Sequence, residues 1–538
     1  MKSKAISISL VFYTLLAFVL SAWILKHSYF IGYDGVYYAR VGENIFLGKG
    51  VSANPGEAYV RKPSFYPFLL GAANLIFKDP EFSGHFVAVW AFALTVIPLF
   101  FITRQVYSEN AAHWASLLYL SNGYLHLHAN AVMTESLFTL LVLTLFLLIQ
   151  RTLQDKKGKE AFLGISIGMV SGIAFLTRLE GVLFYGVGIL AIFLLSQKPP
   201  ASKSKMTLFS LGVFLVFFIP YVNFIHQHTR QFQLGNAMVE AVIRRQIDVA
   251  HPGQDVKVKR IYQGLTSDKS RIKINELVEE FHLLDYLRKD RYALLRSLLP
   301  SMAWRLLGLS KYLFGGLGFF FIGASFVSGP WDSRRKKSEL LFLLFLSTFG
   351  VQLFGEFIPK RYFFYFPFFL IWMGNGIERL RSWASASFHL SQKTSFAVAL
   401  SACLFFAVLS GWYVARTLTT TPVPLEYKEM GLWMKKNLPG IEKEPVAATH
   451  PSVNFYSGSK LLNPPHLPSI EKFEDFLTYM AHQKTKYFVV SDDLETSVLT
   501  ESYRFLLDDT VPPPSGILRL HTVANEGKKI ILYQILSR

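Results

Sequence analysis

The sequence predicts an all-α polytopic membrane protein with about eleven transmembrane helices and a small C-terminal α/β domain. Of its 538 residues, 51% are hydrophobic and 49 are Phe, a composition unlike that of soluble chains. Apolar runs of about 20 residues, the length needed to cross a hydrocarbon core, recur along most of the chain. After Thr417 the hydropathy drops and prolines cluster, which indicates that the last part of the chain leaves the bilayer.

The apolar runs give the expected spans. The first follows Met-Lys-Ser-Lys and ends at Trp23 without a small-x-small cleavage site, so we interpret it as a retained anchor and not a signal peptide. We expect Tyr66–Phe77 to be a loop or a re-entrant or interfacial helix. The spans are predicted at roughly 6–25, 85–104, 111–128, 135–150, 161–176, 181–196, 207–226, 303–328, 340–357, 362–377 and 394–415.

Basic residues cluster between alternate pairs of spans, and with eleven spans every cluster falls on the side of the N-terminus. Because Lys and Arg concentrate in cytoplasmic loops, this predicts an inner-membrane protein with its N-terminus inside and its C-terminus outside. The formal net charge of +18 then reflects topology and a surface facing anionic lipids, and we expect no nucleic-acid partner. The clusters are Lys2 and Lys4; Lys156, Lys157 and Lys159; Lys198, Lys203 and Lys205; Arg334, Arg335, Lys336 and Lys337; and Arg379, Arg381 and Lys393.

Two modules are expected, a transmembrane module over residues 1–416 and a soluble extracytoplasmic α/β domain over 417–538. In the second, Tyr487–Val490 and Lys529–Tyr533 are strand-like and Leu425–Asn437 is helical in pattern. Outer loops at about 26–84 and 227–300 interrupt the first module. The single cysteine, Cys403, lies in an apolar run, which excludes an intramolecular disulfide and Cys-based metal sites.

Candidate functional residues lie at the outer ends of the predicted spans. Asp34 follows the first span and could take a proton from an acceptor, as a general base does; alternatively it caps a helix over Val36–Phe46. Arg61 and Lys62 could attract a lipid phosphate or act as interfacial anchors. Glu135 begins the fourth span, either as a hydrated helix-end acid or as a second carboxylate in the cavity of Asp34.

Two further turns carry cations on the same predicted side. In Thr177-Arg178-Leu-Glu180-Gly181, Arg178 and Glu180 either form a surface pair or line a cavity, with Arg178 as a phosphate ligand. Pro359-Lys360-Arg361-Tyr362 adds the second turn. The convergence of two carboxylates and several cations on one face favours a site there.

At these residues the chain resembles bacterial members of the group formed by dolichyl-phosphate-mannose-protein mannosyltransferases and aminoarabinose transferases acting on lipid A. The resemblance rests on Asp34, Tyr38 and Gly48 of the first outer loop, on Lys62-Pro63-Ser64, on Glu135, and on Leu176-Thr-Arg-Leu-Glu-Gly181. It covers about the first 200 residues. Two departures stand out: Gly35 replaces the usual second acid after the Asp, and Arg61 stands where aminoarabinose transferases tend to have Glu.

The resemblance implies the GT-C fold and an inverting glycosyltransferase that takes a monosaccharide from a polyprenyl phosphate. Its acceptor would be a glycan, a lipid or a protein. Asp34 would be the base, Glu135 would position the acceptor, and Tyr38 and Glu180 would complete the cavity. Lys62, Arg178, and Lys360 or Arg361 would hold the leaving phosphate without a metal cofactor, although a divalent ion joining Asp34 and Glu135 stays open. The alternatives are a lipid-linked sugar flippase and an inactive scaffold of this fold.

Overall fold

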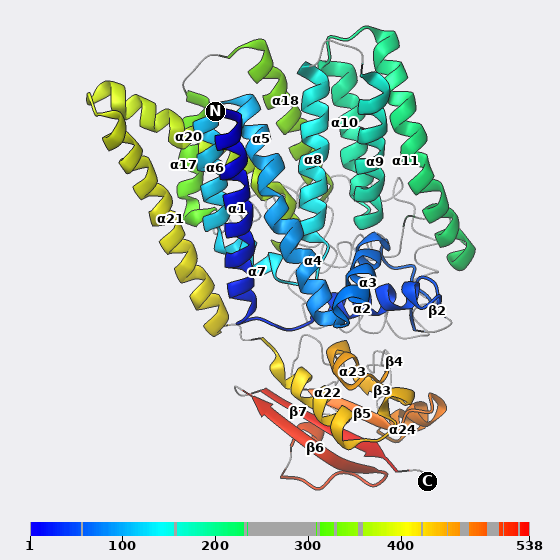
Figure 1. Ribbon diagram of the computed structural model, residues 1–538. Helices are drawn as coiled ribbons and strands as arrows, with labels where there is room; N and C mark the ends of the chain where they lie inside the picture. The colour runs from blue at the N-terminus through cyan, green and yellow to red at the C-terminus, as the bar shows by residue number, and fades with distance from the viewer. Residues whose placement is uncertain are drawn as a thin grey trace, which may run out of the picture.

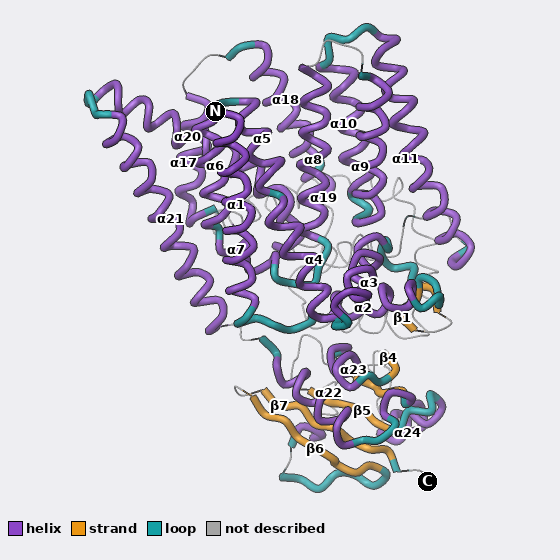
Figure 2. Tube along the Cα trace, in the orientation of Figure 1, coloured by secondary structure: helices purple, strands orange, loops and turns teal. Residues whose placement is uncertain are grey.

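The fold is mostly helical, with strands confined, among the described residues, to a short hairpin and one C-terminal sheet (Figure 2). The computed structural model describes residues 2–54, 57–154, 159–230, 234, 308, 313–327, 331–352, 359–420, 423–448, 450–462, 473–491, 505–508, 510–525 and 528–536. The predicted outer loop at 227–300 therefore lies outside the described residues, apart from 227–230 and 234.

A bundle of helices forms the larger part of the molecule (Figure 1). Figure 1 places the N-terminus at one end of this bundle and the C-terminal sheet beyond the other end. The bundle comprises α1 (Lys2–Leu25), α4 (Pro80–Leu94), α5 (Val96–Val106), α6 (Glu109–Ser121), α7 (Gly123–Ala129), α8 (Glu135–Gln154), α9 (Glu160–Thr177), α10 (Gly181–Leu195), α11 (Pro200–Thr229), α17 (Leu317–Val327), α18 (Ser333–Ser347), α19 (Phe349–Gln352), α20 (Phe366–Ser387) and α21 (Gln392–Thr420), with 3₁₀ turns η1 (Phe314–Gly316) and η2 (Pro359–Tyr365).

Six helical segments among the described residues are long and apolar enough to cross a membrane. Several other predicted spans correspond to shorter helices such as α10 and α17. A chain with this many apolar helices is a multi-pass membrane protein, and the figure of eleven spans remains a prediction. The six segments are Ile6–Leu25, Pro80–Val106, Glu135–Gln154, Glu160–Thr177, Pro200–Thr229 and Gln392–Thr420.

Two helices lie across the end of the bundle nearest the sheet (Figure 1): α2 (Tyr33–Phe46) and α3 (Phe65–Phe77). Their backbones touch, because Gly42 and Gly71 leave no side chain between them. A Cβ on Gly42 would lie 2.3 Å from the Pro67 carbonyl oxygen, and one on Gly71 would lie 2.4 Å from the carbonyl oxygen of Gly42. The loop between them holds the hairpin β1 (Ser52–Asn54) and β2 (Glu57–Ala58). This contact fixes the two segments that carry Asp34 and Lys62.

The C-terminal part contains a five-stranded sheet of order β4-β3-β5-β7-β6. Strand β3 runs parallel to β4 and β5, whereas β7 is antiparallel to β5 and β6. Its elements are α22 (Leu425–Asn437), η3 (Ile441–Lys443), β3 (Pro445–Ala448), α23 (Pro451–Ser457), β4 (Lys460–Leu462), α24 (Phe473–His482), β5 (Tyr487–Ser491), β6 (Ile517–Asn525) and β7 (Lys528–Ile535).

Alternation along β5 gives the sheet two apolar faces. Tyr487 and Val489 join one buried cluster with Met430 of α22, while Phe488 and Val490 join another with Phe476 of α24. This follows from the pleat, which points successive side chains to opposite faces. Helix α21 continues to Thr420, past the predicted module boundary at 416.

Candidate functional site

Asp34 lies in the first turn of α2 and forms an ion pair with Lys62. The Asp34 Oδ1 to Lys62 Nζ distance is 2.8 Å, and the side chains are 22% and 25% exposed. The helix starts at Tyr33, with Gly32 at the N-cap and no side-chain cap hydrogen bond. The alternative that Asp34 caps a helix starting at Val36 is therefore wrong: the helix begins earlier than the apolar pattern suggested. Its carboxylate pairs with the Lys62 ammonium.

Glu135, Arg178 and Glu180 form a second group of charges. Glu135 begins α8, and its Oε1 lies 3.0 Å from Arg178 Nη1, while Glu180 Oε1 lies 2.8 Å from Arg178 Nη2. Glu135 is 4% exposed and Arg178 14%. A simple surface pair between Arg178 and Glu180 is therefore only part of the arrangement, because the guanidinium also binds buried Glu135, while Glu180 is 24% exposed.

Tyr38 of α2 connects the two groups. Its ring is buried, Lys62 Nζ lies 5.2 Å from the ring centre, and its hydroxyl hydrogen-bonds Thr134 beside Glu135. Burial raises the pKa of the Tyr38 phenol well above its ordinary value, and the charge of Asp34 raises it further. The phenol is therefore neutral at physiological pH. Residues predicted separately from several segments meet at one site.

The remaining predicted cations belong to two segments, the one that carries Lys62 and the turn η2. Arg61 is half-buried next to Lys62. Lys360 and Arg361 belong to η2, where the structure describes their backbone but not their side chains. The ring of Phe364, in the same 3₁₀ turn, lies 4.9 Å from that of Phe138 in α8 and 5.8 Å from the Arg178 guanidinium carbon. The predicted third cationic turn therefore passes beside the Arg178 group.

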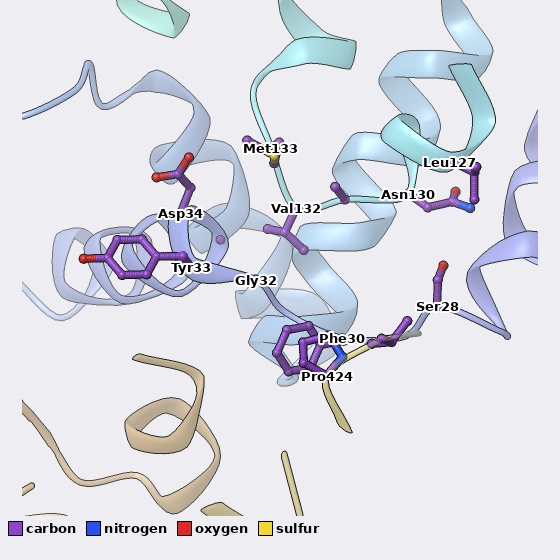
Figure 3. A pocket seen from close by; sticks show the side chains of 13 residues that line it. Ser28, Phe30, Gly32, Tyr33, Asp34, Leu127, Asn130, Val132, Met133 and Pro424 are labelled. Atoms are coloured by element: carbon purple, nitrogen blue, oxygen red, sulfur yellow. The ribbon is translucent and has the colours of Figure 1, made fainter. Parts of the chain in front are cut away.

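A cavity of about 510 Å³ opens beside Asp34 (Figure 3). It lies between the segment that precedes α2, the segment that joins α7 to α8, and the start of the C-terminal part. Sequence reasoning missed most of its wall, since only Asp34 was predicted as a site residue there. The lining residues are Ser28, Phe30, Gly32, Tyr33, Asp34, Gly35, Leu127, Asn130, Ala131, Val132, Met133, Val423 and Pro424.

Gly35, where the resemblance led us to expect a second acid, is closely packed. A Cβ on Gly35 would lie 2.9 Å from Ile31 Cγ1 and 3.0 Å from Val132 Cβ. A second carboxylate after Asp34 has no room beside Val132. The cavity wall at this point is apolar in place of acidic.

The C-terminal part holds the backbone that leads into Asp34. The Tyr456 hydroxyl accepts a hydrogen bond from the Ile31 amide at 3.1 Å and donates one to Glu81 at 2.6 Å. Ser452 donates to the Ile31 carbonyl at 2.7 Å. Lys428 of α22 pairs with Glu81 of α4 at 3.0 Å. The segment that enters α2 is thus fixed by α23 on one side and the bundle on the other.

The carboxylates of the site do not form a ready-made metal centre. In the part of the chain that the structure describes, no three His, Cys, Asp or Glu side chains cluster as metal ligands do. A divalent ion joining Asp34 and Glu135 would have to displace Lys62 and Arg178 from them.

Comparison with known proteins gives this geometry its context. Residues 61–224 match the model of the dolichyl-phosphate-mannose-protein mannosyltransferase family. A curated relative, the undecaprenyl phosphate-alpha-4-amino-4-deoxy-L-arabinose arabinosyl transferase 2 of Pseudomonas fluorescens, is 24% identical over 205 residues. The family resemblance is confirmed. The match spans 37% of this chain but only about a third, 35%, of that relative.

Solved structures extend the likeness to the whole chain as a fold. ArnT from Cupriavidus metallidurans in the apo state superposes with a TM-score of 0.59 at 15% identity, over 99% of this chain and 98% of that one. The Archaeoglobus fulgidus oligosaccharyltransferase gives 0.57 at 13% identity, over 89% and 67%. The chain therefore has the GT-C fold, and its long apolar helices are those of a multi-pass membrane protein.

Proposed function

We propose that this chain is a glycosyltransferase that moves a monosaccharide from a polyprenyl-phosphate donor to an acceptor on the outer face of the inner membrane. The observation that carries the proposal is the meeting of two carboxylates and two cations, Asp34 with Lys62 and Glu135 with Arg178, around buried Tyr38. The chemistry of the relatives supports it: one is an undecaprenyl-phosphate-dependent arabinosyl transferase, and an ArnT structure holds undecaprenyl phosphate.

In this mechanism Asp34 removes the proton of an acceptor hydroxyl or amine while that atom attacks the anomeric carbon. The bond from that carbon to the phosphate oxygen breaks, and the anomeric configuration inverts. The polyprenyl phosphate leaves with the bonding electron pair, and the cations stabilise the charge that develops on it. No further reactant is consumed.

Lys62 connects proton removal with phosphate binding, because its ammonium contacts the proposed base Asp34. A phosphate oxygen would compete with Asp34 for the ammonium, so donor binding would loosen the 2.8 Å pair and leave the carboxylate more basic. Arg178 differs from Lys62, because Glu135 and Glu180 already bind its guanidinium group and fix the orientation of that group. We propose that Lys62 contacts the phosphate directly, aided by Arg61 and the turn at Lys360 and Arg361. Glu135 and Glu180 keep Arg178 oriented, and no metal ion is required.

We further propose the predicted topology, with an extracytoplasmic α/β domain at the C-terminus and a transmembrane module before it. The site lies at the end of the bundle beside the C-terminal sheet, opposite the N-terminus (Figure 1). With the N-terminus in the cytoplasm, the site would face outward, where lipid-linked sugars serve as donors in place of nucleotide sugars. A flippase is disfavoured because the site's charges gather at helix ends next to a soluble part and not midway along the spans.

The test is a donor-trapping experiment. Cells lacking this protein should accumulate one polyprenyl-phosphate sugar, and the purified protein in proteoliposomes should consume that lipid when membranes from the same cells are added as acceptor. Accumulation of no lipid-linked sugar, together with no consumption in vitro, would reject the transferase. A lipid that crosses the bilayer without losing its sugar would instead support the flippase.

A further inference from the structure

Arg40 binds the helix that carries Asp34 to the C-terminal part of the chain. It lies in α2, and its Nη2 donates to the carbonyl oxygens of Asn454 at 2.9 Å and Ser459 at 2.7 Å. Asn454 belongs to α23, and Ser459 lies just before β4. Figure 1 shows α23 between α2 and the C-terminal sheet. One side chain of α2 is therefore bonded directly to the backbone of the other module.

The carbonyls that accept from Arg40 are held in place by the C-terminal part itself. The Asn454 side chain is fully buried, and its Nδ2 donates to the carbonyl oxygens of Val446 in β3 at 2.9 Å and Lys460 in β4 at 3.0 Å. Asn454 also lies in the last turn of α23, where carbonyls lack a backbone partner within the helix and carry partial negative charge. A guanidinium is a favourable partner for such a group, so Arg40 has a fixed anchor on the sheet.

Arg40 lies on the side of α2 away from its contacts with the bundle. With about 3.6 residues per turn, Gly42 lies roughly 80° around the helix from Asp34, and Arg40 roughly 240°. Gly42 packs on the backbone of α3, and Gly35 packs on Val132. Glycine contacts allow close approach but contribute no side-chain hydrogen bond, so they do not by themselves fix the rotation of α2 about its axis. Arg40 supplies a directional bond from the other side.

The position of Asp34 depends on this rotation. A turn of α2 by roughly 10° would move a group on its surface, about 5–6 Å from the axis, by roughly 1 Å. Asp34 is such a group, and its carboxylate lies 2.8 Å from the Lys62 ammonium. A misplacement of about 1 Å at a reacting group can cost on the order of a hundredfold in rate.

We propose that Arg40 is a positioning residue for the transfer reaction: it fixes the rotation of α2 and thereby orients Asp34 toward the acceptor. This inference rests on the proposed function, in which Asp34 is the base. The bonds that Ile31 makes to the C-terminal part hold only the chain before α2, whereas Arg40 holds the helix itself. In this role Arg40 touches neither substrate, so its loss lowers kcat and leaves the KM for the sugar donor unchanged.

The experiment compares full-length variants in proteoliposomes with the trapped lipid-linked sugar as substrate. Arg40→Met keeps about the length of the side chain and removes both bonds. Its kcat should fall about tenfold to a hundredfold, while the KM for the lipid-linked sugar and the affinity for undecaprenyl phosphate stay within about twofold of wild type. Arg40→Gln, which is too short to reach both carbonyls, is measured in the same way if Arg40→Met does not fold.

A double variant tests whether Arg40 acts through Asp34. In the Asp34→Asn protein the base is already lost, so adding Arg40→Met should lower kcat no further. A residue that acted elsewhere in the reaction would lower it again by the full factor.

Arg519 provides a matched control. Its Nη2 donates to the carbonyl oxygens of Asp508 at 3.0 Å and Val511 at 2.7 Å, so it makes the same pair of bonds, but within the C-terminal part. Arg519→Met should keep the wild-type kcat. A fall confined to Arg40→Met then cannot come from the loss of two such bonds alone.

Four results would overturn the positioning role: wild-type kcat in the Arg40 variant, an equal fall in Arg519→Met, a raised KM for the lipid-linked sugar at unchanged kcat, or full additivity with Asp34→Asn. In each of these the wild type still transfers sugar, so the transferase itself stands. No transfer by the wild type would instead reject the proposed function, and the two failures are therefore distinguishable.

Discussion

Replacing Asp34 by Asn tests the proposed base most directly, since the change removes charge with almost no change in shape. The pair with Lys62 is short, at 2.8 Å, but each side chain is roughly a quarter to a fifth exposed. Ion pairs this accessible contribute about 0–1 kcal/mol. We therefore expect little loss of thermal stability. Turnover should fall by roughly a hundredfold or more, as removal of a general base does.

The assay follows consumption of the trapped donor lipid in proteoliposomes at matched protein amounts. Asp79→Asn is the control: Asp79 is a true N-cap, accepting from the Phe82 amide at 3.0 Å, and Asn caps as well as Asp. That variant should keep wild-type turnover. If Asp34→Asn also transferred sugar at close to the wild-type rate, Asp34 would be only a partner for Lys62, and the base would have to be sought elsewhere.

Four further outcomes are expected. Lys62→Ala should weaken undecaprenyl phosphate binding by on the order of 1.5–3 kcal/mol in a titration, and unchanged affinity would reduce Lys62 to an interfacial anchor. Arg178→Ala should lower stability by about 3–5 kcal/mol, because it leaves Glu135 buried without its cation; a denaturation midpoint like that of wild type would contradict this. Tyr456→Phe should cost about 1–3 kcal/mol and slow turnover, since the Ile31 amide and Glu81 lose a shared partner; unaltered kinetics would show that α23 does not position Asp34. Reporters active only in the cytoplasm should be silent at Arg538 and active after Lys203, and activity at Arg538 would reverse the proposed sidedness.

The sequence by itself determined the membrane class and several helix positions, and it singled out candidate site residues. These depend on local properties: an apolar run long enough to cross a bilayer, or an acid at the end of such a run, is visible without any knowledge of packing. Helix α8 begins at Glu135, where the pattern predicted it, and α22 spans Leu425–Asn437 as expected.

The tertiary structure alone decided which of these residues meet. Nothing local in the sequence pairs Asp34 with Lys62 or directs Arg178 to Glu135, because such contacts depend on how α2, α3, α8 and α9 pack. The bond from Tyr456 to Ile31 joins positions 425 residues apart. The cavity beside Asp34 carried no signal in the sequence either, because segments far apart along the chain, from Ser28 to Pro424, assemble its wall.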